Sequence, residues 1–214
     1  MLSDGVQSSW SNARVFVPLD NAWNIPVSEV GWNGKTFLTE FAKALKTECS
    51  DTKWNLAYHA YSYPLTEAPY KKNQYVTKSA DSPYITPQNL KYLTNYIKKK
   101  YGPSTRIILA EQGYMASMGE KAQAASILYS YYMAEFDPMV DAYLMRCEYD
   151  DAWEVSQGYA MGLSDSKGKR REAYKIFKYM DSTKSTAYAK RYLKMVGASS
   201  WKKIIPGYKA SRFK

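Results

Sequence analysis

At 214 residues the chain is long enough for one domain with a full hydrophobic core, and a hydrophobic content of 45% excludes an intrinsically disordered protein. No apolar stretch approaches the roughly 18 residues of a membrane-spanning helix, and the first seven residues do not resemble a secretory signal. The net charge of +10 raises the question of nucleic-acid binding. Because no zinc-finger spacing, RNP-like strand or glycine-rich phosphate loop accompanies the charge, we expect no nucleic-acid partner.

The basic residues are scattered along expected helix faces, and the densest stretches are residues 167–171 and 202–214. Attraction to an anionic cell wall or polysaccharide accounts for such a charge. Tyrosine is unusually frequent, with 21 copies against 6 Phe and 6 Trp, and its apolar ring with a polar tip suits a carbohydrate surface or a polar-edged core. The two cysteines, Cys49 and Cys147, form no CxxC motif, and we expect no disulfide framework, no metal and no cofactor.

The first half of the chain reads as two strand–helix units. An apolar strand at residues 14–19 ends at Asp20 and Trp23, and helical spacing follows over residues 34–49. A second strand, near residues 54–60, runs through His59 towards Tyr61. The long loop at residues 64–84 is rich in Tyr, Pro and Lys, and loops of this length are usually functional or mobile. Thr86 followed by Pro87 predicts the start of a helix that runs to residue 101.

The second half repeats the pattern. Residues 106–111 form a short apolar strand that stops at Glu111 and Gln112, with a helix over residues 120–136 after it. A fourth strand at residues 140–147 leads into a polar loop that contains Glu148, Tyr149 and Trp153. A helix over residues 170–180 closes the last unit. The segment beyond residue 185 is expected to be helical to about residue 196 and loosely structured after that.

Four alternating strand–helix units predict a single α/β domain over residues 1–214, with residues 185–214 as a C-terminal helix and tail. The four strands should be parallel, in sequential order, with helices on one face. Parallel strands place their carboxyl ends on one edge, where polar and aromatic candidates should gather: Asp20, Trp23, His59, Tyr61, Glu111, Gln112, Glu148, Tyr149 and Trp153. A flavodoxin-like or Rossmann-type domain has the same alternation, but residues 20–26 do not form the phosphate-binding loop that it requires.

Three motifs resemble the large superfamily of retaining (β/α)8-barrel glycoside hydrolases that includes endoglucanases. Residues 107–113, Ile-Ile-Leu-Ala-Glu-Gln-Gly, resemble the seventh strand with its nucleophilic Glu followed closely by Gly. His59–Ala60–Tyr61 resembles the His-x-Tyr of the sixth strand, also found in an uncharacterised branch of bacterial barrel proteins. Trp153 lies where the loop after the eighth strand supplies a sugar-stacking Trp, and residues 162–177 resemble the end of these enzymes. The resemblance implies a TIM-barrel-like fold of which the chain covers about half.

The resemblance also implies a role for each candidate in a double displacement on a polysaccharide or oligosaccharide. Glu111 would attack the anomeric carbon, with Tyr61 holding its carboxylate ionised and oriented. His59 would reach a sugar hydroxyl, and three rings would stack on sugar faces: Trp23, Tyr149 and Trp153. Asp20, Gln112 and Glu148 complete the expected substrate-binding set. Simpler interpretations remain for His59 as a core residue and for Trp23 and Trp153 as caps on the barrel mouth.

One departure limits the resemblance. The family's general acid/base lies in an Asn-Glu pair after the fourth barrel strand, and no Asn-Glu dipeptide occurs in this sequence. We therefore expect strands five to eight of a barrel, inactive alone, with self-association through the exposed edges and lining. A non-catalytic carbohydrate-binding barrel, or another α/β domain that binds a small ligand, is the alternative. The full-length parent is expected to be secreted or attached to the cell surface.

Overall fold

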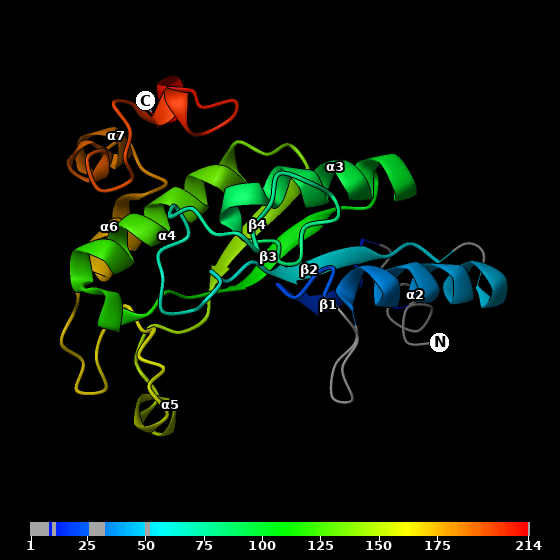
Figure 1. The fold of residues 1–214 in the computed structure, drawn as a ribbon, viewed down its shortest axis with the longest axis horizontal. Helices are drawn as coiled ribbons and strands as arrows, with labels where there is room; N and C mark the ends of the chain where they lie inside the picture. The colour runs from blue at the N-terminus through cyan, green and yellow to red at the C-terminus, as the bar shows by residue number, and fades with distance from the viewer. Residues whose placement is uncertain (1–8, 10–11, 26–32, 50–51, 214) are drawn as a thin grey trace.

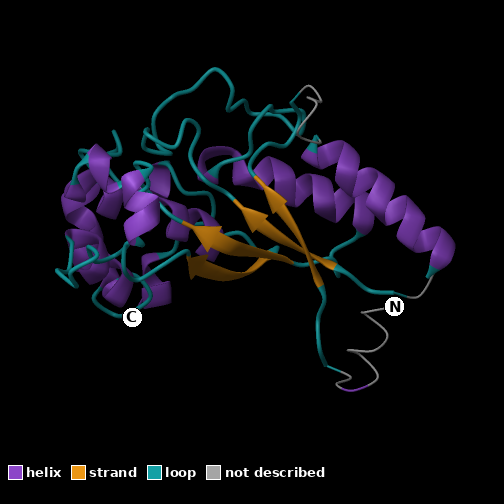
Figure 2. Cartoon of the chain, turned by 90° about the horizontal axis from the view of Figure 1, so that it is seen from below, coloured by secondary structure: helices purple, strands orange, loops and turns teal. Residues whose placement is uncertain are grey.

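The computed structural model describes residue 9 and residues 12–25, 33–49 and 52–213. Four strands form one parallel sheet in the order β1-β2-β3-β4, which confirms the predicted direction and order. Figure 2 shows these strands side by side, with the helices outside them. The strands are β1 (Phe16–Asp20), β2 (Asn55–His59), β3 (Ile107–Gln112) and β4 (Val140–Met145).

Three long helices lie along the sheet (Figure 1): α2 (Gly34–Glu48), α3 (Leu90–Tyr101) and α4 (Glu120–Glu135). The side chain of Asn33 caps α2 by accepting a hydrogen bond from the Thr36 N–H. The predicted start signal at Thr86 forms a capping box around the short 3-10 helix η1 (Pro87–Asn89), which leads directly into α3. Local sequence therefore determines where α2 and η1 begin.

The core between sheet and helices follows the alternation of strand residues. In β3, Ile107 and Leu109 are fully buried and pack in one cluster with Leu38 of α2 and Leu93 of α3. Ile108, which alternates with them, is partly exposed on the opposite face. The helices therefore cover one face of the sheet, as predicted. Among the described residues, β1 and β4 each pair with one neighbour and form the edges.

Helix α4 is buried on nearly every side. The sheet lies on one side of it, and α6 (Glu172–Tyr179) with the C-terminal segment lies on the other. That segment contains α7 (Ser185–Ala189), η3 (Lys190–Tyr192), η4 (Trp201–Lys203) and η5 (Ala210–Phe213), and Figure 1 shows it gathered beyond α4 in orange and red. The expectation of a loosely structured tail is wrong, because Trp201 and Phe213 are buried against Tyr132.

Two short helices lie outside the predicted helices, the second of them in the segment that was expected to be a polar loop. The first is η2 (Ala116–Met118), between β3 and α4. The second is α5 (Ala152–Ser156), where the Asp151 side chain accepts hydrogen bonds from the N–H groups of Trp153 and Glu154. Helix α5 is set apart from the sheet in Figure 1. In the described part of the chain, every helix is too short or too polar to cross a membrane.

An ion cluster joins the two edges of the sheet. The Asp141 carboxylate in β4 binds Arg106, with 2.9 Å from Nε to Oδ1, and also Arg14, which lies just before β1. Hydrogen bonds from Arg106, assisted by Arg14, hold the pKa of the Asp141 carboxyl below its usual range. A carboxylate with a lowered pKa stabilises the fold at neutral pH and loses that contribution as the pH falls through its folded-state pKa.

We expect Asp141→Asn to lower the free energy of unfolding by about 1 kcal/mol at pH 7. The difference from wild type should shrink below about pH 4, where the unfolded-state carboxyl is protonated and the folded-state group follows it. Urea unfolding at several pH values measures this. Glu40→Gln, at an exposed glutamate with no ion pair among the described residues, is the matched control and should change stability little. A pH-independent loss at Asp141 would contradict the ionic account.

Candidate active site

The carboxyl edge of the sheet carries a cavity of about 690 Å³. Each of the four strand ends contributes to its lining: Asp20 from β1, His59 from β2, Glu111 from β3 and Arg146 directly after β4. The long loop after β2 and helix α5 complete the walls. Parallel α/β folds place ligands at this edge, because strand ends and loops converge there.

The Glu111 carboxylate is held from two directions. Its Oε1 accepts a hydrogen bond from the Tyr61 hydroxyl and another from Arg146 Nη1 at 2.9 Å. The predicted contact between Tyr61 and Glu111 is thereby confirmed. Burial, followed by the hydrogen bond to Glu111, raises the pKa of Tyr61, so the phenol stays a protonated donor at neutral pH. No described residue hydrogen-bonds to Oε2, and about a third of the Glu111 side chain is exposed.

Arg146 links two carboxylates. While Nη1 binds Glu111, Nη2 binds Glu154 of helix α5. This arginine therefore ties α5 to the end of β3 with two charge-assisted hydrogen bonds. Neither Arg146 nor Glu154 was predicted as a site residue, because no motif marks either one. The available signal was the place of Arg146 in the chain, directly after the fourth strand, where the carboxyl-edge argument already applied.

Gly113 leaves room for Met161, which packs with the Tyr61 ring. A Cβ atom at this position would lie 2.9 Å from Met161 Sδ, 3.3 Å from Met161 Cβ and 3.5 Å from Tyr61 Cε1. Tyr61 and Met161 pack in one small buried cluster beneath the cavity. The glycine two residues after Glu111, which carried part of the family resemblance, therefore has a packing role, because it admits Met161 to the cluster that contains Tyr61.

Aromatic rings line the cavity beside the polar centre. Trp153 of α5 is 71% exposed, so its ring faces are available to a ligand. Tyr63 and Tyr84 stack with ring centroids 3.6 Å apart on the opposite loop. Asn73 Nδ2 holds this loop by donating to the Tyr63 carbonyl at 2.7 Å. Rings with polar tips around a carboxylate are suited to sugar faces and hydroxyls.

Two predicted substrate-binding residues are buried instead. Trp23 is fully buried, packs edge-on against Tyr58 and Tyr96, and donates from Nε1 to the Ala80 carbonyl at 2.9 Å. Gln112 is also fully buried, with Nε2 donating to the Glu111 carbonyl at 2.9 Å. Neither side chain lines the cavity. The proposed ligand contacts of Trp23 and Gln112 are therefore wrong in this structure.

Glu148 and Tyr149 also lie outside the cavity lining. Glu148 is exposed and accepts a hydrogen bond from the Ser164 N–H through its backbone carbonyl. Tyr149 is 53% exposed and bridges to Ser164 through its backbone. The cavity thus gathers five of the nine predicted candidates: Asp20, His59, Tyr61, Glu111 and Trp153.

The acidic residues after β4 have structural partners. The Asp150 side chain, 3% exposed, binds Arg171 and accepts the Gly162 N–H at 2.7 Å. Asp151 caps α5. These contacts leave Asp20 and Glu154 as the carboxylates that share the cavity with Glu111. Within the described ranges, no group of three or more His, Cys, Asp or Glu residues is arranged to hold a metal ion.

Two solved structures share this architecture. Xylanase 10B from Thermotoga petrophila RKU-1, in complex with xylobiose, matches with a TM-score of 0.51 at 15% identity, over 82% of this chain and 48% of the xylanase. A hyperthermophilic β-glucosidase from Pyrococcus furiosus matches with a TM-score of 0.51 at 18% identity, over 86% of this chain and 45% of the glucosidase. The chain thus spans about half the length of these proteins. Its four parallel βα units have the fold of half a TIM barrel, as predicted.

A comparison with curated proteins gave no match. The family comparison covers almost the whole chain. Residues 1–204 match the model of a family of unknown function, DUF5722, and the chain therefore belongs to that family.

Proposed function

We propose that this chain is the C-terminal half of a barrel that hydrolyses glycosidic bonds with retention, and that Glu111 is its nucleophile. One observation carries the proposal: a carboxylate at the carboxyl edge of a half TIM barrel, bound on a single oxygen by Tyr61 and Arg146 inside an aromatic-lined cavity. The names of the two similar structures, a xylanase and a β-glucosidase, support a β-linked glycan as the substrate class.

The hydrogen bonds to Glu111 suit a nucleophile. Both donors reach Oε1, so they orient the carboxylate while Oε2 stays available for attack on the anomeric carbon. The attack forms a bond from Oε2 to the anomeric carbon and breaks the bond to the leaving oxygen. That oxygen then needs a proton, from a second carboxyl group roughly 5 Å from the first in a retaining site.

The charge of the cavity favours a neutral sugar. Asp20, Glu111 and Glu154 give it three carboxylates against the single guanidinium of Arg146. A uronic acid would meet this negative excess, whereas a neutral ring could stack on Trp153. Asp20 and His59 lie side by side in the register of β1 and β2, where the side chains of both can form hydrogen bonds with sugar hydroxyls.

Covalent labelling tests the nucleophile directly. Activated 2-deoxy-2-fluoro glycosides with a dinitrophenolate leaving group need no proton donor, so the glycosyl–enzyme bond can form with the nucleophile alone. We expect one sugar of a gluco-, xylo-, manno- and galacto-configured panel to add its mass to the peptide that contains Glu111. Intact-protein and peptide mass spectrometry measure the adduct.

Glu111→Gln should remain unlabelled, because an amide cannot replace the carboxylate. Glu148→Gln removes an exposed carboxylate outside the cavity and should label like wild type. Labelling of the Glu111→Gln variant at the same site, or no adduct from any sugar of the panel, would contradict the assignment of Glu111.

A non-catalytic carbohydrate-binding barrel is the second candidate. The structural engagement of Asp150 and Asp151 favours it, because it removes two carboxylates that could have served as proton donors. This candidate predicts that neutral oligosaccharides bind at the cavity and that Trp153→Ala weakens the binding, without any adduct on Glu111. Calorimetry together with the labelling experiment separates the two functions.

A further inference from the structure

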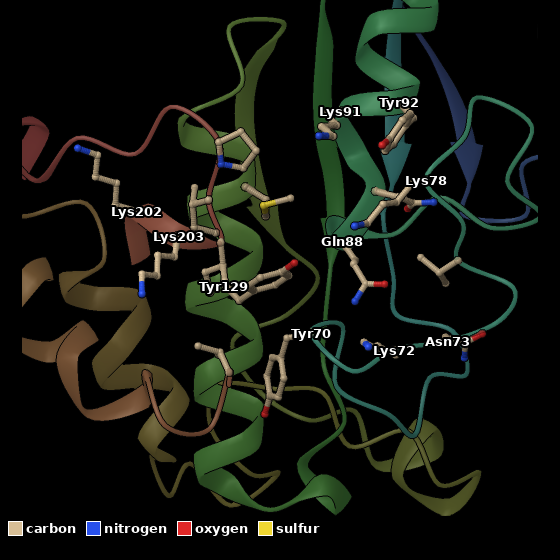
Figure 3. Close-up of a pocket in the computed structure, with 17 residues that line it drawn as sticks. Tyr70, Lys72, Asn73, Lys78, Gln88, Lys91, Tyr92, Tyr129, Lys202 and Lys203 are labelled. Carbon is tan, nitrogen blue, oxygen red and sulfur yellow. The ribbon is translucent and has the colours of Figure 1, made fainter. Parts of the chain in front are cut away.

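A second cavity, of about 790 Å³, lies between α3 and α4, away from the carboxyl-edge site. Four segments line it: the loop from Tyr70 to Lys78, the start of α3, the middle of α4, and the C-terminal segment up to Pro206. Figure 3 shows Tyr129 and Lys203 on one wall, and Lys78 and Lys91 on the facing wall. It shares no lining residue with the Glu111 cavity.

Lysines dominate this cleft. Five of them line it, and no Asp or Glu does. In the described part of the chain none of the five forms an ion pair, although five arginines elsewhere are each paired with at least one carboxylate. They come from separate parts of the sequence, and folding brings them together: Lys72, Lys78, Lys91, Lys202 and Lys203. An uncompensated cluster in a concave site attracts an anionic ligand, because the walls concentrate the field of the charges.

The wall that carries Lys72 and Lys78 is held by a buried side chain. Asn89 is 1% exposed, and its Nδ2 donates to the Thr77 and Tyr84 carbonyls, each at 2.9 Å. Its Oδ1 accepts the Thr86 N–H at 2.8 Å. These hydrogen bonds hold the loop against the start of α3, so the backbone that carries Lys72 and Lys78 has a defined position.

The aromatic rings of the cleft offer no flat platform. Tyr70 and Tyr129 meet edge to face at 6.0 Å, and Tyr129 is 6% exposed. The Lys91 ammonium lies over the Tyr92 ring, 5.2 Å from its centroid. Single-stranded nucleic acid gains much of its affinity from bases stacked on open rings, which this cleft does not provide. The amides of Asn73 and Gln88 line it and can pair with hydroxyl groups.

We propose that this cleft binds an acidic oligosaccharide, a chain of sugars that carry carboxylate or sulfate groups. Lysines on both walls would pair with the anionic groups, and the amides with the hydroxyls between them. The site is independent of the catalytic proposal, because it lies outside the Glu111 cavity and uses none of its residues.

Calorimetric titration of the whole chain with hexagalacturonate, at about 50 mM salt, tests the proposal. The cleft variant Lys78→Gln/Lys203→Gln removes one lysine from each wall, and we expect it to bind about tenfold more weakly than wild type, with the loss shrinking as salt rises. Lys98→Gln/Lys99→Gln removes the same charge from an exposed part of α3 outside the cleft, and should stay within about twofold of wild type. Thermal melting establishes that each variant is folded.

Further arms identify the ligand class. A heparin hexasaccharide compares sulfate with carboxylate as the anionic group. Neutral cellohexaose should give no binding signal that depends on the cleft lysines. Glu111→Gln should bind hexagalacturonate like wild type. Equal weakening in the two lysine variants would overturn the proposal, because binding would then depend on net charge. Tighter binding of an oligothymidylate of equal charge would overturn it in favour of nucleic acid.

Discussion

Purified as it stands, the 214-residue chain is expected to show no appreciable turnover of polysaccharides or of unactivated aryl β-glycosides. In the proposed mechanism Glu111 supplies one of the two carboxyl groups that retaining hydrolysis requires, and general acid–base assistance alone is worth about 10²–10⁴-fold in rate. The chain also spans about half the length of the two barrels whose fold it shares. Release of reducing sugar and of nitrophenol measures the activity.

Robust turnover that Glu111→Gln abolishes would contradict this expectation and would show that a second carboxylate is present. Asp20 and Glu154 would then be the first groups to test, because they share the cavity with Glu111. Asp20→Asn and Glu154→Gln separate them. The true proton donor is identified by a variant that loses activity on poor leaving groups and keeps it on dinitrophenolate.

Gly162→Ala should lower the free energy of unfolding by about 3–5 kcal/mol, the range for disruption of a buried ion pair. A Cβ at this position would lie 2.5 Å from the Ser164 carbonyl oxygen, 2.6 Å from the Asp150 nitrogen and 2.8 Å from Asp150 Oδ1. Two of these atoms belong to the backbone and cannot move aside. The methyl group would therefore displace Asp150 from Arg171. Urea denaturation measures the loss.

Gly158→Ala is the matched control. A Cβ there meets nothing within 4 Å, although the φ of +88° is unfavourable for alanine and costs about 1–2 kcal/mol. If Gly162→Ala destabilised the chain no more than Gly158→Ala, steric contact at Gly162 would not be the reason for a glycine at that position.

Much of the fold could be predicted because its signals are local. Apolar runs mark the strands, and Thr86–Pro87 marks the start of a helical segment. The contact of Tyr61 with Glu111 could also be predicted, since both residues lie at the ends of adjacent parallel strands and the family resemblance pairs them. The tail after residue 185 was misjudged because its packing depends on α4, more than 50 residues away.

Site details that depend on distant packing could not be read from the pattern. Trp23 follows the end of a strand, where residues that line a ligand cavity are expected, but Tyr96 of α3 and the loop around Ala80 enclose its ring. Gln112 adjoins Glu111, yet it is fully buried. The register of β3 on β4 shifts between Leu109 and Gln112, so simple alternation along the strand does not predict its face. Arg146 belongs to no sequence motif, and its role becomes visible only when folding brings Glu111 and Glu154 to its guanidinium group.

The two cavities also differ in the sign of their charge. The one at the carboxyl edge has more carboxylates than cations, while the one between α3 and α4 has five ammonium groups and no carboxylate, on a protein of net charge +10. Such a molecule is electrically polar, so a polymer with alternating neutral and acidic blocks would approach it in a preferred orientation. Its acidic blocks would be attracted to the lysine-lined cleft, and its neutral blocks would lie at the cavity that contains Glu111. If both proposals hold, this separation of charge would sort the segments of one polysaccharide chain before any sugar ring reaches Glu111.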